Sequence, residues 1–265
     1  MATMAPHVDR LVSLAAGTVL DVDPARAVDV AAEAGYGGVG IWFDPDTFDA
    51  SVAQAVRRRL EATGIVALDV EPIILGPEGD PGDVLVDAAG EIGARFILLA
   101  SRWKDHGAAV DRAAALCEQA RPFGITIAVE FLPPFAVGSL AAAVAFAGEV
   151  GAPNCGVLVD TLHLDRSRGT VADVAAADRS RFPYLQLADA PAVWGSDWRD
   201  EALHGRLLPG EGDLPLVAVL QVVPDVPVSV ELRSRALMTG FPDPVERARV
   251  VLATTRQTLA AADAG

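Results

Sequence analysis

Four apolar runs from residue 125 onward each carry an oxygen-bearing side chain at or near their end. The runs are ITIAVEF, GVLVDTLHL, YLQLADAP and VSVELRS, with Glu130, Asp160, Gln186 and Glu231 at these points. One such carboxylate can be explained as a capping or salt-bridged group, since a charge buried alone is costly. Three carboxylates and an amide that meet at one end of neighbouring strands would need a cation between them. We therefore predict a divalent metal site with these four residues as ligands.

The ligand chemistry also indicates the kind of ion. Oxygen donors in this number suit Mn²⁺, Mg²⁺ or Co²⁺ better than a tetrahedral zinc site. We expect Mn²⁺ first, with Mg²⁺ and Co²⁺ as alternatives.

Further residues near these strand ends suit substrate binding. His163 follows Asp160 in a DxxH spacing that lets its ring reach the same cavity, although a purely structural histidine is an open alternative. Arg206 lies in HGRLLPGEGDLP, a segment that could close over the site and present a cationic fork to a substrate oxygen, unless it is a solvated turn. Glu71 follows the third apolar run and Trp42 lies at the end of the second. Both are expected at the rim, with a core position as the alternative for Trp42.

The elements that position these residues alternate along the whole chain. Continuous apolar runs, typical of parallel strands covered on both faces, are found at residues 11–15, 39–43, 65–70, 96–100, 125–129, 156–159, 184–187 and 226–230. Helical patterns follow at about 23–35, 50–63, 82–93, 107–120, 138–150, 170–177, 214–221 and 243–262. This order predicts a single (β/α)₈ TIM barrel formed by residues 1–265, with catalytic residues at the strand ends. The rival is an open doubly-wound sheet, but the first loop, AAGTVLDVDP, lacks its GxGxxG spacing.

Composition narrows the class of partner. A net charge of −15 and a pI of about 4.6, without a cluster of basic residues, argue against nucleic acid as a ligand. We see neither a secretory signal nor an apolar run long enough for a membrane span, so we expect a cytoplasmic protein. The two cysteines, Cys117 and Cys155, are expected to be buried and unpaired.

Five motifs, VEF, VDTLH, YLQLADAP, HGRLLPGEG and VELRS, resemble those of the xylose-isomerase-like barrel superfamily. This superfamily includes sugar isomerases and epimerases, dehydratases and apurinic endonucleases. The resemblance covers essentially the whole chain. It implies the same metal ligands, an acid–base pair formed by Glu130 and Glu231, and substrate contacts from His163 and Arg206.

The segment after Glu130 departs from the family patterns. Where ketohexose epimerases carry polar or acidic residues, this chain has Pro133 and Ala136. Where one branch of dehydroshikimate dehydratases carries a histidine, it has Leu132. Neither specificity therefore carries over to this chain.

Three functions remain open at this level. The leading hypothesis is a metal-dependent isomerase or epimerase of a small polyhydroxy carbonyl compound that reacts through an enediolate. The alternative is a dehydratase or lyase acting on a cyclic polyol ketone, of inosose or 3-dehydroshikimate type, or on an oxidised sugar glycoside. The third is a non-catalytic binding protein, which Gln186 turned away from the other ligands would favour. Trp194 and Trp198 are consistent with a homo-oligomer contact or with a cover over the site.

Overall fold

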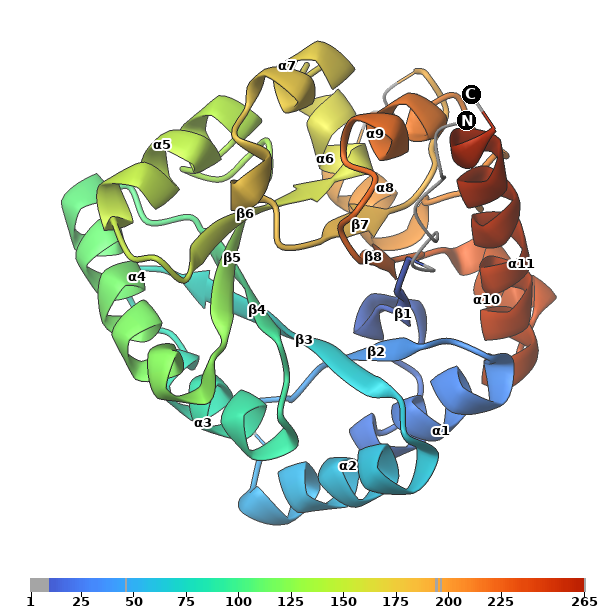
Figure 1. Cartoon of the computed structure of the whole chain (residues 1–265), viewed down its shortest axis with the longest axis horizontal. Coiled ribbons are helices and arrows are strands. Elements are labelled where there is room, and N and C mark those ends of the chain that lie inside the picture. Colours follow the sequence, from blue (N-terminus) through green and yellow to red (C-terminus); the bar gives the residue numbers. More distant parts are fainter. Residues whose placement is uncertain (1–9, 46, 194, 196, 265) are drawn as a thin grey trace, which may run out of the picture.

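Eight parallel strands close into a barrel in the order in which they occur along the chain (Figure 1). The computed structural model describes residues 10–45, 47–193, 195 and 197–264. The strands are β1 (Val12–Leu14), β2 (Gly38–Ile41), β3 (Val66–Leu75), β4 (Phe96–Ser101), β5 (Thr126–Glu130), β6 (Cys155–Asp160), β7 (Leu185–Leu187) and β8 (Val228–Val230). The prediction of a (β/α)₈ barrel is confirmed.

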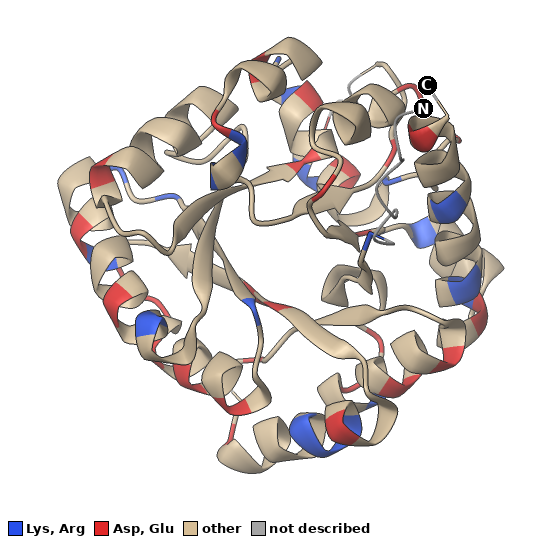
Figure 2. Ribbon diagram, viewed as in Figure 1, with Lys and Arg blue, Asp and Glu red and all other residues tan. Residues whose placement is uncertain are grey.

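The predicted helices form a ring around the barrel (Figure 1). They are α1 (Pro24–Ala34), α2 (Ala50–Thr63), α3 (Gly82–Ile92), α4 (His106–Ala120), α5 (Leu140–Val150), α7 (Val171–Ala176), α9 (Leu216–Val222) and α11 (Pro244–Asp263). Figure 2 shows that much of the charge lies on this outer layer. Among the described residues, no helix combines the length and apolar character needed to cross a bilayer.

Three further helices lie in the loops after strands and were not predicted. They are α6 (Thr161–Arg166), α8 (Trp198–His204) and α10 (Arg235–Gly240). Each has only six or seven residues. Each begins after a side chain that accepts backbone N–H bonds, namely Asp160, Asp197 and Ser234.

Strand β3 is irregular in a way that the apolar pattern did not reveal. Val39 pairs with Ala67 and Gly40 with Asp69, so Leu68 is an extra residue that forms a β-bulge. The strand also continues through a cis Glu71–Pro72 bond to Leu75. Glu71 therefore lies inside β3, and its predicted position after the strand was wrong. The predicted strand ended at residue 70 because Pro72 cannot donate a hydrogen bond to a neighbouring strand and is therefore unusual inside a sheet.

The core has two parts. Most buried apolar side chains belong to one large cluster that joins the barrel to its helices. A smaller cluster inside the barrel consists of Leu68, Leu98, Ala128, Leu158 and Tyr184. Leu11, just before β1, and Phe96, the first residue of β4, pack against this smaller cluster. The smaller cluster therefore fills the barrel interior toward the strand starts.

Candidate active site

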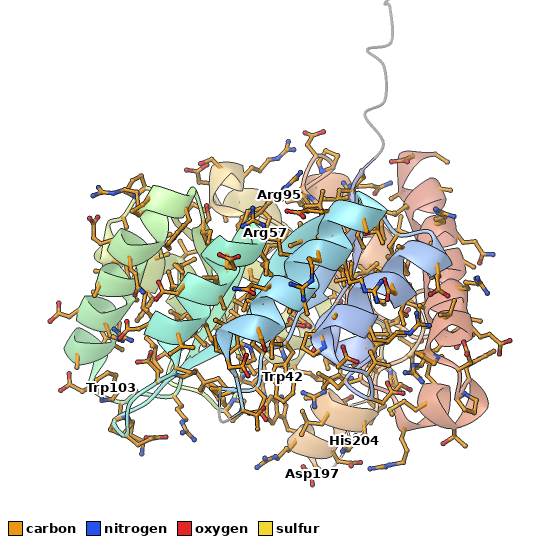
Figure 3. The ribbon with its side chains drawn as sticks, turned by 90° about the horizontal axis from the view of Figure 1, so that it is seen from below. Trp42, Arg57, Arg95, Trp103, Asp197 and His204 are labelled. Carbon is orange, nitrogen blue, oxygen red and sulfur yellow. The ribbon has the colours of Figure 1, made fainter. Side chains whose placement is uncertain are left out.

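A cavity of about 540 Å³ lies at the end of the barrel where the strands finish. Glu71, Glu130 and Glu231 line it together with His163 and Arg206. Trp42 lines the cavity too and is 40% exposed. All six residues predicted for catalysis or substrate binding therefore lie on the surface of one cavity. In Figure 3, Trp42, Trp103 and His204 lie toward this end of the barrel and Arg95 toward the other.

Arg206 is the central cation among these side chains and is 2% exposed. Its Nη1 lies 2.6 Å from Oδ2 of Asp160, and its Nη2 lies 3.1 Å from Oε2 of Glu231. Its Nε donates to the carbonyl oxygen of Ala202 in α8 at 3.2 Å. Arg206 therefore links two of the four predicted ligands, which the sequence analysis had not anticipated.

The two carboxylate oxygens of Asp160 have separate partners. Oδ1 accepts from the backbone N–H groups of Leu162 and His163 at 2.7 and 3.0 Å and so caps α6. Oδ2 faces Arg206. Burial alone would raise the pKa of Asp160, but Arg206 and His163 outweigh it, and the pKa lies below its ordinary value. Asp160 is thus an ionised group held in a fixed orientation.

Glu130 and His163 face each other, with 3.7 Å between Oε1 and Nε2. Ligand atoms of Glu130, Asp160 and His163 lie within 4.8 Å of one another. Burial, and next the charges of Asp160 and Glu231, raise the pKa of Glu130 well above its ordinary value. Burial lowers the pKa of His163 to about 4, which leaves a neutral imidazole at neutral pH. A neutral imidazole is the form that binds a metal ion.

Gln186 is fully buried and held by Glu71. Its Nε2 donates to Oε2 of Glu71 at 2.9 Å, while its own Oε1 has no hydrogen-bond partner. The other oxygen of Glu71 accepts from the N–H of Gly17 at 3.2 Å. Burial, followed by the charges of Asp69 and Glu231, raises the pKa of Glu71 well above its ordinary value. Glu71 thus fixes the amide of Gln186, a contact that the sequence pattern did not suggest.

This donor set fits a divalent cation. It combines three carboxylates with two buried atoms that lack a hydrogen-bond partner, Oε1 of Gln186 and Nδ1 of His163. Such unpartnered buried atoms are uncommon and call for an explanation such as an ion or water. Among the described residues, one group of closely spaced ligand atoms contains two of the predicted ligands, Glu130 and Asp160, together with His163. The full set of Glu130, Asp160, Gln186 and Glu231 remains a prediction.

The segment expected to close over the site, residues 204–215, is held by hydrogen bonds to Asp189. The Asp189 carboxylate accepts from the N–H groups of Gly210 at 2.9 Å and Leu214 at 3.1 Å. Its backbone forms an antiparallel bridge with Leu207. A side chain at position 212 would place Cβ only 2.3 Å from Oδ1 of Asp189, so glycine is required there. These contacts anchor the chain that follows Arg206.

A buried polar group below the cavity was missed by the sequence analysis. Tyr184 donates to Oδ2 of Asp69 at 2.9 Å, and both are fully buried. Oδ1 of Asp69 and the hydroxyls of Ser13 and Ser229 have no hydrogen-bond partner. Burial raises the pKa of Asp69 to about 7. The one available signal was an acidic residue in the middle of the run IVALDV.

Trp194 and Trp198 are the two tryptophans predicted to form a subunit contact or a cover over the site. Trp198 lines the cavity, and its ring centroid lies 6.0 Å from that of His163. It therefore belongs to the cover of the site. Trp194 lies outside the described residues.

Comparisons with known proteins agree with this architecture. Residues 28–256 match the family described as xylose isomerase-like TIM barrel. The chain belongs to this family. An inosose isomerase of Halalkalibacterium halodurans is 29% identical over 123 residues. That match covers 44% of this chain and 43% of the relative, so it spans less than half of the relative's length.

Solved structures of other proteins show the same fold. The IolI protein, in a structure with a bound zinc atom, superposes with a TM-score of 0.79 at 17% identity and covers 94% of this chain and 98% of its own. The 3-keto-D-glucoside 4-epimerase YcjR from E. coli superposes with a TM-score of 0.73, also at 17% identity. It covers 94% of this chain and 100% of its own. At these identities the likeness establishes the fold alone.

Proposed function

We propose that this protein is a divalent-metal-dependent isomerase or epimerase of a small polyhydroxy carbonyl compound, a sugar or sugar derivative. The observation that carries this proposal is the pair Glu130 and Glu231. They come from strands separated by β6 and β7 and line one cavity. Arg206 pairs with Glu231 and with Asp160, and Asp160 lies close to Glu130. Two carboxyls at one cavity, with different electrostatic surroundings, are what a reaction with one proton removal and one proton return requires.

We assign the metal to Glu130, Asp160, Gln186 and Glu231, with His163 as a further donor and Mn²⁺ as the first candidate. When bound, such a cation polarises the substrate carbonyl and makes the neighbouring C–H more acidic. The zinc atom bound to the related IolI protein supports a metal in this fold, although it is a different ion.

The surroundings of the two glutamates suggest how they divide the work. Burial is the largest cause of a raised pKa at both. At Glu231 the next largest influence is Arg206, which lowers the pKa, whereas at Glu130 like charges rank ahead of Arg206 and raise it further. Glu231 is therefore the better candidate for the ionised base that removes the proton. Glu130 is the better candidate for the acid that returns a proton to the opposite face or the adjacent carbon. In the reverse direction the two exchange roles.

The oxygen that becomes negative in the enediolate needs donors already in place. Arg206 lines the cavity and its Nε is held by the α8 carbonyl, so its guanidinium can donate to this oxygen when Asp160 turns to the metal. His163 is neutral and can donate one ring N–H. These two residues would orient the substrate as well as stabilise its charge.

A lyase is the second candidate, acting on a cyclic polyol ketone or an oxidised sugar glycoside. The same proton removal would be followed by loss of a β-hydroxyl or of a glycosidic oxygen. The observation in its favour is Leu132, which lines the cavity just beyond Glu130 and gives no hydrogen bond to a substrate hydroxyl. A less hydroxylated product would suit this wall.

The test is metal titration together with hydrogen exchange. Metal-stripped wild type and Glu231→Gln would be titrated with Mn²⁺ by calorimetry, then incubated in D₂O with ketoses, inososes and 3-dehydroshikimate. We expect stoichiometric binding that weakens at least about tenfold in the variant, a loss of about 1.4 kcal/mol. Deuterium should enter the substrate only with wild type, and the NMR spectrum of the product separates isomerase from lyase. Glu211→Gln, an exposed acid in the neighbouring segment, is the matched control and should behave as wild type.

Either of two results would overturn the proposal. Wild type that binds no divalent ion, or a Glu231→Gln variant that binds as tightly as wild type, removes the metal site. Metal binding without deuterium exchange on any substrate of the panel removes the isomerase and lyase chemistry.

A further inference from the structure

The cavity is larger than the group of charged residues at its floor. Its volume of about 540 Å³ lies within the range of about 300–1,000 Å³ that is typical of sites for drug-sized ligands. The floor residues that would act on a hydroxycarbonyl group, Glu130, His163, Arg206 and Glu231, occupy one part of the lining. The rest of the space must accommodate another part of the substrate.

The remaining lining is mainly apolar, and we call it the apolar wall. It consists of Leu20, Trp42, Ile74, Leu132, Phe135 and Leu203. All six are at least partly exposed, and Leu20 and Trp42 are each 40% exposed. Large apolar side chains left open to solvent inside a cavity commonly mark ligand contacts. The wall is continuous with the floor in a single cavity, so the same ligand would touch both.

The chemistry of the wall selects what can lie against it. A further row of sugar hydroxyls would lose water there without gaining hydrogen-bond partners, which is unfavourable. An aromatic or alkyl group would bury apolar area against the same side chains, which is favourable. The rings of Trp42 and Phe135 also offer surfaces on which a planar group can stack. Besides Arg206, three arginines line the cavity: Arg102 and Arg199 are exposed and keep their charges in solvent, and the charge of Arg233 acts on Glu231 at the floor.

We propose that the substrate of this site carries an apolar, aromatic-sized group attached to its polyhydroxy carbonyl part, and that the apolar wall binds this group. This inference rests on the proposed function, because the floor is taken to bind the hydroxycarbonyl part. It narrows the substrate class from simple sugars to sugar derivatives that bear an aryl or similar substituent.

Two small hydroxyketones test this directly. 2-Hydroxyacetophenone and hydroxyacetone share the hydroxycarbonyl unit and differ in an aryl against a methyl group. Binding to the Mn²⁺-loaded protein would be measured by calorimetry. We expect the aryl ketone to bind at least about tenfold more tightly, because it buries more apolar area. Trp42→Ala and Phe135→Ala should each reduce this preference and leave hydroxyacetone unchanged.

Trp103→Ala is the matched control. Trp103 follows β4 at the same end of the barrel, is absent from the cavity lining, and lies well apart from Trp42 in Figure 3. It should keep the full preference. Equal affinities for the two ketones, no detectable binding of the aryl ketone, or a preference unchanged in both wall variants would overturn the inference.

The outcome is separable from that of the proposed function. The preference should persist in Glu231→Gln when measured at saturating metal, because the apolar wall is intact in that variant. Deuterium exchange on simple sugars without a preference for the aryl ketone would refute the proposed role of the apolar wall and leave the proposed isomerase activity standing. A preference for the aryl ketone without deuterium exchange on any substrate would support the proposed role of the apolar wall and refute the proposed isomerase activity.

Discussion

Arg206 is predicted to act as the internal counter-ion of the site when no metal is bound. Replacing it by methionine keeps much of the side-chain volume and removes the charge. Asp160 and Glu231 would then face each other across the cavity without their shared partner. We expect Arg206→Met to be strongly destabilised in metal-free buffer.

The magnitude follows from two distances. Nitrogen–oxygen separations of 2.6 and 3.1 Å correspond to attractions of about 6 and 5 kcal/mol at an effective dielectric constant of about 20. The cost of removing the buried guanidinium from water offsets much of this. Breaking a buried ion pair from one side typically costs about 3–5 kcal/mol, and we expect a loss in that range.

The assay is urea unfolding with EDTA and with excess Mn²⁺. A ligand at 100 times its Kd adds about 2.7 kcal/mol to the free energy of unfolding. In the variant, Mn²⁺ no longer competes with Arg206 for Asp160, so it should bind more tightly than in wild type. The difference in stability between variant and wild type should therefore shrink when Mn²⁺ is added.

Arg247→Met serves as the control. Arg247 is 1% exposed, pairs with Asp21 and donates to the carbonyl oxygen of Phe241 at 3.0 Å, outside the lining of the cavity. Its replacement should also destabilise the protein, but Mn²⁺ should not reduce that loss. The reasoning fails if Arg206→Met is as stable as wild type in EDTA, or if Mn²⁺ restores both variants equally.

Two further predictions concern the buried layer below the cavity. Folding raises the pKa of Asp69 from 3.8 to about 7, so the free energy of unfolding of wild type should fall relative to Asp69→Asn by about 1.4 kcal/mol per pH unit between these values. Urea unfolding at several pH values from 4 to 8 measures this slope. A difference between the two proteins that does not change with pH would contradict the raised pKa. Gly40→Ala would place Cβ 2.6 Å from Oδ1 of Asp69 and should lower the free energy of unfolding by about 1–3 kcal/mol, measured by thermal unfolding. Gly148→Ala is the control, because its Cβ would meet no atom within 4 Å, and it should be neutral or slightly stabilising. Equal effects of the two substitutions would contradict the close approach at Gly40.

The barrel could be predicted because its parallel strands are buried on both faces. Such strands are continuous apolar runs, and the glycines that end α1, α2, α3 and α5 mark where the next run begins. Helix α2 was predicted at its observed bounds for this reason. The bulge at Leu68 could not be predicted, because an extra residue in an apolar run leaves the run apolar. It turns Asp69 toward Tyr184 inside the barrel, where the sequence shows only one more acidic residue.

The candidate site could be predicted in its composition but not in its pairing. Glu130, Asp160 and Glu231 stand out because each carboxylate follows an apolar run. The contact of Arg206 with Asp160 joins residues 46 positions apart. It depends on Asp189 anchoring the chain that follows Arg206, and no local pattern reports such an anchor.

The two-sided bonding of Asp160 bears on which ions the site would accept. One oxygen is used to start α6, so only the other can turn toward a cation. The carboxylate is therefore restricted to a single coordinating oxygen. Calcium prefers six to eight oxygens and often takes both from one carboxylate, whereas smaller ions complete their shells with fewer. Capping a helix with a proposed metal ligand would thus limit the coordination number of the site and favour smaller ions over larger ones.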